Sequence, residues 1–255
     1  MLSYKDIKFL QKNKKARDVQ GLFVAEGGRL FTETPPGLIE QVLMTRKYAA
    51  EHPEVWEHIL PGTPVDDGID EARFFSLTDT KTPQGILAVV RKKSWSYAEV
   101  TQVACPLYVI LENMQDPGNA GTVLRTGEAA GVTAVFLTEG SVDLYSPKTI
   151  RSTMGSVYRV PHFVVRDAPS LIADLAKKDV ASYAAHLRGR GAYTAYDYRG
   201  GAAFVIGNEG NGLTDAAAES CTHLVRIPMM GRVESLNAAM AAGILMYEAL
   251  RQRRQ

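Results

Sequence analysis

The sequence has little of what several large classes of protein require. Two cysteines in 255 residues, Cys105 and Cys221, are too few for a disulfide framework or a zinc cluster, so we expect a reducing, cytoplasmic setting. The 5 histidines show no spacing typical of metal ligands, and no metal site is predicted. No run approaches the ~20 apolar residues of a membrane-spanning helix, and the basic start lacks the apolar core of a secretory signal. We therefore expect a globular protein without membrane attachment.

The net charge is also small, +1 at pH 7, which by itself argues against a nucleic-acid partner. The charge is unevenly distributed, however, because six Lys and Arg oppose a single Asp in residues 1–17. Clustered positive charge is typical of phosphate-binding surfaces. The segment is thus a candidate phosphate-binding arm, with a solvated arm that only aids solubility as the alternative.

Hydrophobic patterns divide the chain into two predicted domains. Residues 1–93 mix helix-like and strand-like pieces, and residues 94–104 have little periodicity and are predicted to form a linker. In residues 105–255, apolar runs of strand length alternate with helix-like segments, among them 146–156. This alternation predicts an α/β fold with a mostly parallel sheet covered by helices on both faces. In the first domain the expected strands are 21–27, 40–45, 73–79 and 85–92, and the expected helices are 4–13 and 47–59.

Three unusual stretches follow predicted strands, which is where ligands bind in open α/β sheets. The first, at residues 112–131, is ENMQDPGNAGTVLRTGEAAG. Asn119 follows an Asp-Pro-Gly turn and is a candidate helix cap, and Gly121 leaves room for a close approach to the backbone. Arg125 lies about 240° from Asn119 around a helix, so helical spacing does not bring the two together. A surface pair with Glu128 is the alternative to a functional role for Arg125.

The second stretch, FVIGNEGNGLT at residues 204–214, opens a strand into a glycine-rich turn. Glycines allow backbone amides to approach a ligand, but the Lys-Ser/Thr pair of a phosphate-binding loop is missing. Glu209 lies among these glycines, where a carboxylate can cap a helix, bind a ribose hydroxyl or hold an arginine. The residues alone leave these roles open.

The third stretch, LVRIPMMGRVESLNAAMAAGILMYEA at residues 224–249, joins a predicted strand to the closing helix. Ser235 and Asn237 would point about 200° apart in a helix, so they converge only if this segment is a loop. Asn237 is then placed to cap a helix that is apolar almost all round. Such a helix lies inside the fold or against a second subunit, and its alanines and Gly243 favour the subunit contact.

Taken in order and with these spacings, the three stretches strongly resemble the SpoU (TrmH-type) ribose 2′-O-methyltransferases of the SPOUT superfamily. The family's motifs are Asn-x-Gly-x-x-x-Arg, Gly-x-Glu-x-x-Gly and Ile-Pro-Met-x-Gly-x-x-x-Ser-Leu-Asn. They match Asn119, Gly121 and Arg125, then Gly207, Glu209 and Gly212, then residues 227–237 without a gap. The first domain is similar to the family's small α/β RNA-binding domain, which resembles certain ribosomal proteins. The matching residues there are Arg17, Gly21, Phe23, Glu26 and Gly27.

The resemblance implies S-adenosylmethionine as methyl donor, an RNA substrate, a homodimer formed through the C-terminal domain, and a deep C-terminal trefoil knot. It also implies that backbone groups near the second and third motifs hold the donor. The implied cofactor-binding residues are Gly207, Ile227, Met229, Gly231 and Leu236. The implied catalytic residues are Asn119, Arg125, Glu209, Ser235 and Asn237. The implied RNA-binding residues are Lys12, Lys14, Lys15 and Arg17.

The chemistry that the resemblance implies restricts the role of Arg125. A guanidinium with a pKa above about 12 is a poor base. We therefore predict that Arg125 grips the nearby phosphate and stabilises the developing alkoxide, while Ser235 and Asn237 orient the nucleotide. The proton would leave through phosphate or water.

The alternative functions differ in the RNA substrate or in the class of protein. The separate N-terminal domain favours 23S ribosomal RNA over transfer RNA, by analogy with the family. The alternative to an enzyme is a non-catalytic RNA-binding ribosome-assembly factor on the same fold, and the complete set of catalytic residues argues against it. A dinucleotide-dependent dehydrogenase is disfavoured because no Gly-x-Gly-x-x-Gly joins the first strand and first helix.

Overall fold

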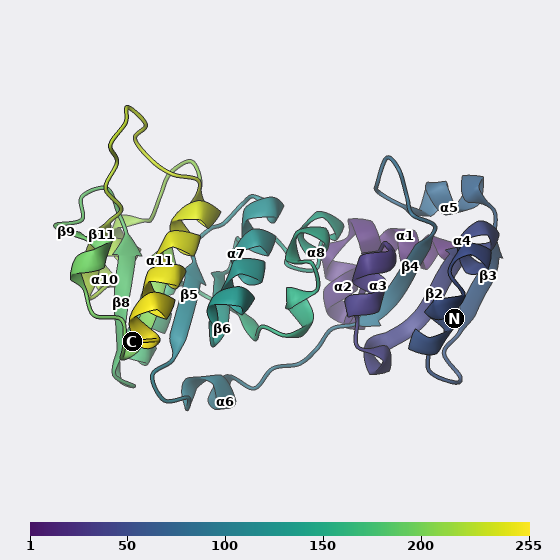
Figure 1. Cartoon of the computed structure of the whole chain (residues 1–255), viewed down its shortest axis with the longest axis horizontal. Coiled ribbons are helices and arrows are strands. Elements are labelled where there is room, and N and C mark those ends of the chain that lie inside the picture. Colours follow the sequence, from purple (N-terminus) through teal and green to yellow (C-terminus); the bar gives the residue numbers. More distant parts are fainter. The chain divides into compact units, whose positions relative to one another are not determined.

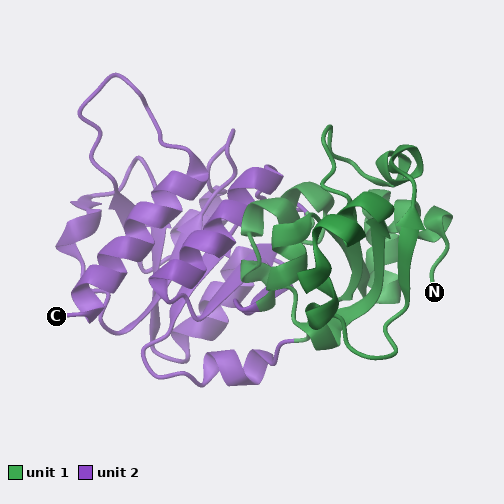
Figure 2. Cartoon of the chain, turned by 45° about the vertical axis from the view of Figure 1, so that its right-hand side comes forward, with its two compact units in different colours: residues 1–94, 143–158 green, residues 95–142, 159–255 purple.

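The computed structural model describes all 255 residues and groups them into two compact units (Figure 2). Unit 1 comprises residues 1–94 and 143–158, and unit 2 comprises residues 95–142 and 159–255. None of the helices combines the length and the apolar character that a membrane crossing requires. The expected domain boundaries stay a prediction, and the compact units differ from them mainly in the placement of residues 143–158.

Unit 1 is built on a four-stranded sheet with the order β1-β4-β2-β3. The β1-β4 and β4-β2 pairs are antiparallel and the β2-β3 pair is parallel. The strands are β1 (Leu22–Glu26), β2 (Ile39–Thr45), β3 (Val65–Ile69) and β4 (Ile86–Arg91). The helices are α1 (Tyr4–Lys12), α2 (Lys14–Gln20), α3 (Gly28–Glu33), α4 (Arg46–Glu51), α5 (Glu71–Leu77) and α8 (Pro147–Thr153). Short 3-10 turns cover Pro36–Leu38, Pro53–His58 and Ser156–Tyr158.

The predicted strand at 73–79 is wrong, because this segment forms α5. Asp70 caps the helix by accepting a hydrogen bond from the Arg73 amide. Phe74 and Leu77, three positions apart, are buried, whereas Phe75 between them is 54% exposed. This alternation of buried and exposed residues is that of a helix. In the sequence, an aromatic-rich run of this length is compatible with a strand as well as with a helix. The predicted helix at 47–59 is split by Pro53 into α4 and a 3-10 turn.

Residues 143–158 were expected in the second domain but pack in the core of unit 1. Arg17 forms a buried ion pair with Asp143, at 2.6 Å. The Tyr145 ring lies 4.9 Å from that of Phe23. The Tyr158 hydroxyl accepts a hydrogen bond from Thr34 at 2.8 Å. The helix predicted at 146–156 is present as α8, but only the structure shows which core it joins.

Unit 2 contains a seven-stranded sheet with the order β7-β6-β5-β10-β8-β11-β9. Every neighbouring pair in it is parallel, which confirms the predicted mostly parallel α/β architecture. The strands are β5 (Leu107–Leu111), β6 (Ala134–Thr138), β7 (His162–Val165), β8 (Val180–Ala185), β9 (Gly191–Ala192), β10 (Gly201–Ile206) and β11 (His223–Arg226). The helices are α6 (Tyr97–Thr101), α7 (Pro117–Ala130), α9 (Ala168–Ala176), α10 (Asp215–Ser220) and α11 (Ala238–Arg253), and a 3-10 turn covers Tyr193–Ala195.

Both faces of this sheet are covered. Buried residues of α6, α9 and α10 pack with Tyr108 and Ile110 of β5. On the other face, α7 and α11 lie side by side, and α11 contacts β10 (Figure 1). The predicted linker at 94–104 contains α6, which Ser96 caps and Val100 anchors in the core. One short turn of helix gave too little periodicity to be recognised in the sequence.

Candidate active site

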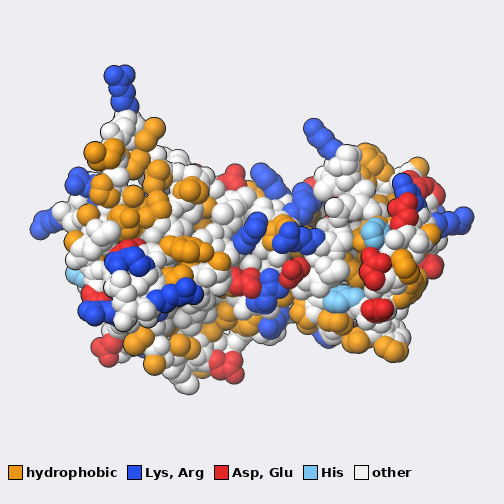
Figure 3. Space-filling view, in the orientation of Figure 1, with side chains coloured by type: hydrophobic (Ala, Val, Ile, Leu, Met, Phe, Trp, Pro, Cys, Tyr) orange, Lys and Arg blue, Asp and Glu red, His pale blue; other side chains and the backbone are white.

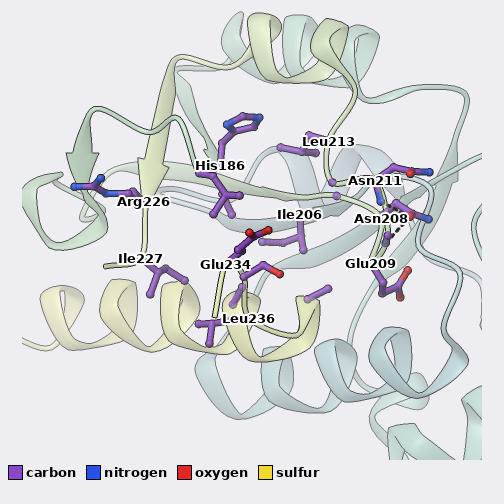
Figure 4. Close-up of a pocket in the computed structure, with 18 of the residues that line it drawn as sticks. His186, Ile206, Asn208, Glu209, Asn211, Leu213, Arg226, Ile227, Glu234 and Leu236 are labelled. Atoms are coloured by element: carbon purple, nitrogen blue, oxygen red, sulfur yellow. Dashed lines mark hydrogen bonds between the residues drawn. The ribbon is translucent and has the colours of Figure 1, made fainter. Parts of the chain in front are cut away.

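A pocket of about 380 Å³ lies at the carboxyl ends of the neighbouring strands β10, β8 and β11 (Figure 4). In a parallel sheet these ends meet at one edge, which is where open α/β folds bind ligands. Its walls come from three segments: residues 185–187 after β8, residues 206–213 after β10, and the loop between β11 and α11. The loop that follows β5 adjoins this edge, since β5 pairs with β10.

The first motif loop positions Asn119 differently from the prediction. Asp116, not Asn119, caps α7, because its carboxylate accepts hydrogen bonds from the amides of Gly118 and Asn119. The helix begins at Pro117, so Asn119 lies in its first turn. The predicted cap is therefore wrong, and the Asn119 side chain remains available for other contacts.

Glu209 accepts three hydrogen bonds from this loop. Its Oε1 accepts from the Asp116 amide and from Asn119 Nδ2, both at 3.0 Å, and its Oε2 accepts from the Gln115 amide at 3.2 Å. Burial raises the pKa of Glu209, but the hydrogen bonds from Asn119 and the backbone outweigh it, so its pKa lies below the usual value. The side chain is thus an ionised acceptor. No arginine pairs with it, so among the expected roles the holding of an arginine is not observed.

Glycine is required where the second motif folds back on itself. A Cβ on Gly207 would lie 2.2 Å from the carbonyl carbon of Gly212, and Gly212 has a φ of +71°. Asn208 holds the turn, because its Oδ1 accepts from the Gly210 and Asn211 amides. Its Nδ2 donates to the Asn113 carbonyl at 2.8 Å, which ties the second motif to the first.

The third motif is a loop up to Asn237, which confirms the condition set for Ser235 and Asn237 to converge. Asn237 Oδ1 caps α11 by accepting from the amides of Ala239 and Met240. Its Nδ2 donates to Asn119 Oδ1 at 2.9 Å. Side chains of all three motifs are therefore joined in one hydrogen-bonded chain, Asn237 to Asn119 to Glu209. Residues 227–236 make no backbone hydrogen bonds to one another, which leaves their main-chain donors and acceptors for a ligand.

Most of the predicted cofactor-binding residues line the pocket. They are Gly207, Ile227, Met229 and Leu236, and the predicted catalytic residues Glu209 and Ser235 line it as well. Gly231 is not among the lining residues and lies in the exposed part of the loop.

Arg125 is exposed on α7 and has no hydrogen-bond or ion-pair partner in the chain. The alternative pair with Glu128 is not formed, because Glu128 pairs with Arg159. The Arg125 guanidinium is thus free to meet a ligand.

The predicted RNA-binding residues in unit 1 do not share one environment. Lys12 and Lys15 are exposed, and Lys14 pairs with Asp18 at 2.6 Å. Arg17 is buried, with 5% of its side chain exposed, and its guanidinium donates to Asp143 and to the carbonyls of the last turn of α1. It cannot reach a phosphate from there. The assignment of Arg17 to RNA binding is corrected to a structural role.

Sequence reasoning missed three features of the pocket. Asn208 stands inside the glycine-rich motif, directly after Gly207, and an amide at that position is the available signal. Glu234 lines the pocket one residue before the Ser-Leu-Asn triplet. His186, which follows β8, also lines the pocket. It belongs to none of the three motifs, and only the order of the strands in the sheet brings it to this position.

The surroundings of His186 favour its neutral form. Burial lowers its pKa, and the nearby Arg188 lowers it further against a smaller opposing effect of Asp215. The Arg188 amide donates to His186 Nδ1 at 3.0 Å, so the proton lies on Nε2.

Two protein families match this chain, one in each of its two parts. Residues 106–247 match the SpoU rRNA Methylase family, and residues 4–88 match the MRM3-like substrate binding domain. The chain is 34% identical over 241 residues to the 23S rRNA (guanosine(2553)-2'-O)-methyltransferase RlmP of Bacillus subtilis, with 92% of this chain and 90% of that protein covered.

Two solved structures resemble the whole chain. An AdoMet-bound rRNA methyltransferase of Sinorhizobium meliloti superposes with a TM-score of 0.82 and 30% identity, covering 97% of this chain and 94% of that one. The SpoU methyltransferase AviRb of Streptomyces viridochromogenes, in complex with AdoMet, gives a TM-score of 0.85 and 25% identity, covering 99% and 98%.

Proposed function

Because the chain belongs to the SpoU rRNA methylase family, we propose that it transfers a methyl group from S-adenosylmethionine to a ribose 2′-hydroxyl of 23S ribosomal RNA. The observation that carries this function is the hydrogen-bonded chain of Asn237, Asn119 and Glu209 beside the pocket. A ribosome-assembly factor without activity would not need these side chains held together. We propose that the enzyme acts in the cytoplasm, where ribosomes are.

The choice of ribosomal over transfer RNA rests on the first part of the chain. RlmP, similar over 92% of this chain, is named for 23S rRNA, and residues 4–88 match a substrate binding domain. We propose residues 1–93 as the RNA-binding domain, 94–104 as the connection and 105–255 as the catalytic domain. Lys12 and Lys15 remain candidates for phosphate contacts because they are exposed.

The pocket suits a nucleoside with a short charged tail. Its volume of about 380 Å³ lies within the usual range of ligand sites, roughly 300–1,000 Å³. Ile206, Ile227 and Leu236 supply apolar walls for a heterocycle, and the loop between β11 and α11 supplies free backbone groups for its polar edge. When bound, S-adenosylmethionine supplies a methyl group already activated on a sulfonium sulfur. The protein therefore needs to align the acceptor and assist the loss of its proton.

The residues around the hydrogen-bonded chain divide these tasks. Glu209 fixes Asn119 and the start of α7, and its low pKa makes it a poor proton acceptor. Asn237 and Ser235 orient the nucleotide. Arg125, unpaired and exposed, grips the phosphate next to the target ribose and stabilises charge on the attacking oxygen. The proton leaves through phosphate or water.

A homodimer is proposed through the outer face of α11. Its inner face packs in the chain, and there Gly243 approaches Thr126 of α7, so the small residue serves an internal contact. Met240 and Tyr247 are 60% and 49% exposed, and with Ile244 they form an apolar stripe at helical spacing. Figure 3 shows hydrophobic side chains gathered over α11 and the base of the preceding loop. A stripe of this kind is typical of a subunit contact.

A C-terminal trefoil knot remains part of the proposal. One tight passage supports it: Gly189, whose Cβ would lie 2.6 Å from the Val225 carbonyl carbon. A threaded chain requires such close passage of segments that are distant in the sequence.

The function is tested by incubating the purified protein with labelled S-adenosylmethionine and either 23S rRNA or tRNA, both transcribed without modifications. We expect label in 23S rRNA only, at one ribose mapped by alkaline-resistant cleavage, and no label with Asn119→Ala. Label in tRNA alone would overturn the choice of RNA. Donor binding without transfer to any RNA would overturn the enzyme in favour of the assembly factor.

A further inference from the structure

The pocket contains two carboxylates with different surroundings. Glu209 accepts three hydrogen bonds from N–H groups and is fully engaged in holding the first motif loop. Glu234 lines the same pocket and forms no hydrogen bond or ion pair with any residue of the chain. Figure 4 shows its carboxylate directed from the loop before α11 toward the pocket. Of the two carboxylates in the pocket, Glu234 is therefore the one that forms no polar contact within the fold.

No cation of the pocket neutralises Glu234. Arg226 lines the wall at the end of β11, and Figure 4 shows its guanidinium on the far side of Ile227 from Glu234. The pKa of His186 is lowered by burial and by Arg188, which disfavours its charged form. The remaining neighbours in the wall are aliphatic, among them Ile206 and Leu236. The pocket therefore presents one uncompensated negative charge beside apolar surface.

The ligand of the proposed function carries the complementary charge. S-Adenosylmethionine has a positive sulfonium sulfur, and moving a cation against apolar walls is costly unless an anion pairs with it. After the methyl group leaves sulfur for the ribose oxygen, and the ribose proton passes to water or phosphate, the product is a neutral thioether. Its amino-acid tail is unchanged, so the sulfonium is the only charge that the donor loses.

We propose that the carboxylate of Glu234 recognises the sulfonium charge, so that the pocket favours the methyl donor over its demethylated product. This inference rests on the proposed function. It makes Glu234 a specificity-determining residue for the cofactor and gives the enzyme a means of releasing the product after transfer.

Chain geometry favours the sulfonium over the amino group of the tail as the partner. The reacting methyl group must lie beside the acceptor ribose, and so close to Ser235 and Asn237. Glu234 directly precedes Ser235, and consecutive Cα atoms are only about 3.8 Å apart. The reacting centre is thus nearer to Glu234 than a tail that extends away from it. Glu234 itself is exposed, so the attraction is that of a partly solvated charge pair.

The test compares binding of two ligands by calorimetry: S-adenosylmethionine and S-adenosylhomocysteine. For the wild-type protein we expect the donor to bind more tightly than the product. For Glu234→Gln, which keeps the shape and removes the charge, donor affinity should fall roughly fivefold, as for a partly solvated charge pair, while product affinity stays the same. Glu234→Asp should retain part of the preference. Glu219→Gln, on the exposed end of α10 outside the pocket, is the matched control and should change neither affinity.

The possible failures are distinguishable. If Glu234→Gln weakens both ligands equally, the carboxylate contacts the shared amino group and the sulfonium assignment is wrong. If it changes neither, Glu234 has no part in binding. In both cases the proposed function stands. Failure of the wild-type protein to bind either ligand would instead overturn the proposed function.

Discussion

At the scale of single residues, Glu209 shows how an ionised carboxylate can join two loops through the hydrogen bonds it accepts. Its hydrogen bonds hold it ionised and join two loops that are about 90 positions apart in the sequence, as in its bond to Asn119. An acid that must stay charged to hold its partners contributes stability only over the pH range in which it is charged.

Glu209→Gln tests this role. We expect the free energy of unfolding to fall by about 1 kcal/mol at pH 7, because hydrogen bonds to a charged acceptor are replaced by weaker ones. The folded-state pKa lies below the unfolded one, so the stabilisation is present above the ordinary carboxyl range and is lost as the pH falls. Urea denaturation at several pH values should show the gap between the two proteins closing as the pH falls below ~4. A gap that widens in acid would show that Glu209 is stabilised in its protonated form.

Arg125 provides a second test at this scale. Arg125→Ala should lower turnover by about 100-fold or more, the usual effect of removing one charge-stabilising donor, with donor binding unchanged. Arg125→Lys keeps the charge but loses the two-pronged contact, so intermediate activity and weaker RNA binding are expected. Single-turnover rates and filter binding measure the two effects. Full activity and RNA binding in the lysine variant would rule out the phosphate clamp.

The family resemblance selected Asn119, Glu209 and Asn237, and the structure joins their side chains by hydrogen bonds. The residues alone left their roles open. The sequence could not show that Asp116 takes over the helix cap and thereby frees Asn119, since either side chain can cap a helix. Arg17 was misassigned because a cluster of positive charge in sequence does not reveal which member is buried.

At the scale of elements, Asn237 belongs to a helix terminus and to the site at once. Its oxygen caps α11 and its nitrogen donates to Asn119. Asn237→Asp keeps the cap, because Asp is as good an N-cap as Asn, but loses the donor. We expect thermal stability within about 0.5 kcal/mol of the wild type and turnover lowered at least tenfold. Asn237→Ala should lose both functions, with about 1 kcal/mol of stability, so comparing the two variants separates the roles.

Arg17 connects the end of α1 to the segment 143–158 of unit 1. Its guanidinium pairs with Asp143 and also satisfies carbonyls at the C-terminus of α1. Arg17→Met should lower the free energy of unfolding by roughly 3–5 kcal/mol, because it strands a buried carboxylate. Lys15→Ala, at an exposed position nearby, is the control and should leave stability unchanged. Loss of RNA affinity in Arg17→Met without loss of stability would restore the original assignment.

Elements were predicted best where their burial pattern is regular. The strand β5 is buried along its whole length, as its continuous apolar run indicated. The aromatic residues of α5 predict a strand, whereas the feature that determines the helix is the Asp70 cap. The two-residue strand β9 carries too few residues for any pattern.

At the scale of the molecule, the spatial order of the strands in the sheet could not be predicted from the sequence. The segment 143–158 returns to unit 1 between two strands of unit 2, and alternation of helices and strands gives no sign of such an excursion. The trefoil knot remains a prediction drawn from family resemblance, since general rules of chain topology disfavour knots.

The dimer contact can be tested at the same scale. Met240 and Tyr247 of the stripe are exposed on α11, so charge placed at these two positions should not disturb the core. We expect the wild-type protein to sediment as a dimer, and Met240→Glu combined with Tyr247→Glu to sediment as a monomer with unchanged circular dichroism. Burying two carboxylates in an apolar contact without partners costs more than such an interface can offset.

Phe75→Glu is the matched control for this change. Phe75 is 54% exposed on α5 of unit 1, so the same kind of substitution there should leave the dimer intact. A wild-type protein that stays monomeric at tens of micromolar would contradict the subunit contact, and the stripe would then lack an explanation within the proposed assembly. A dimer that survives the double substitution on α11 would place the contact on another surface, because two opposed pairs of carboxylates could not remain buried together.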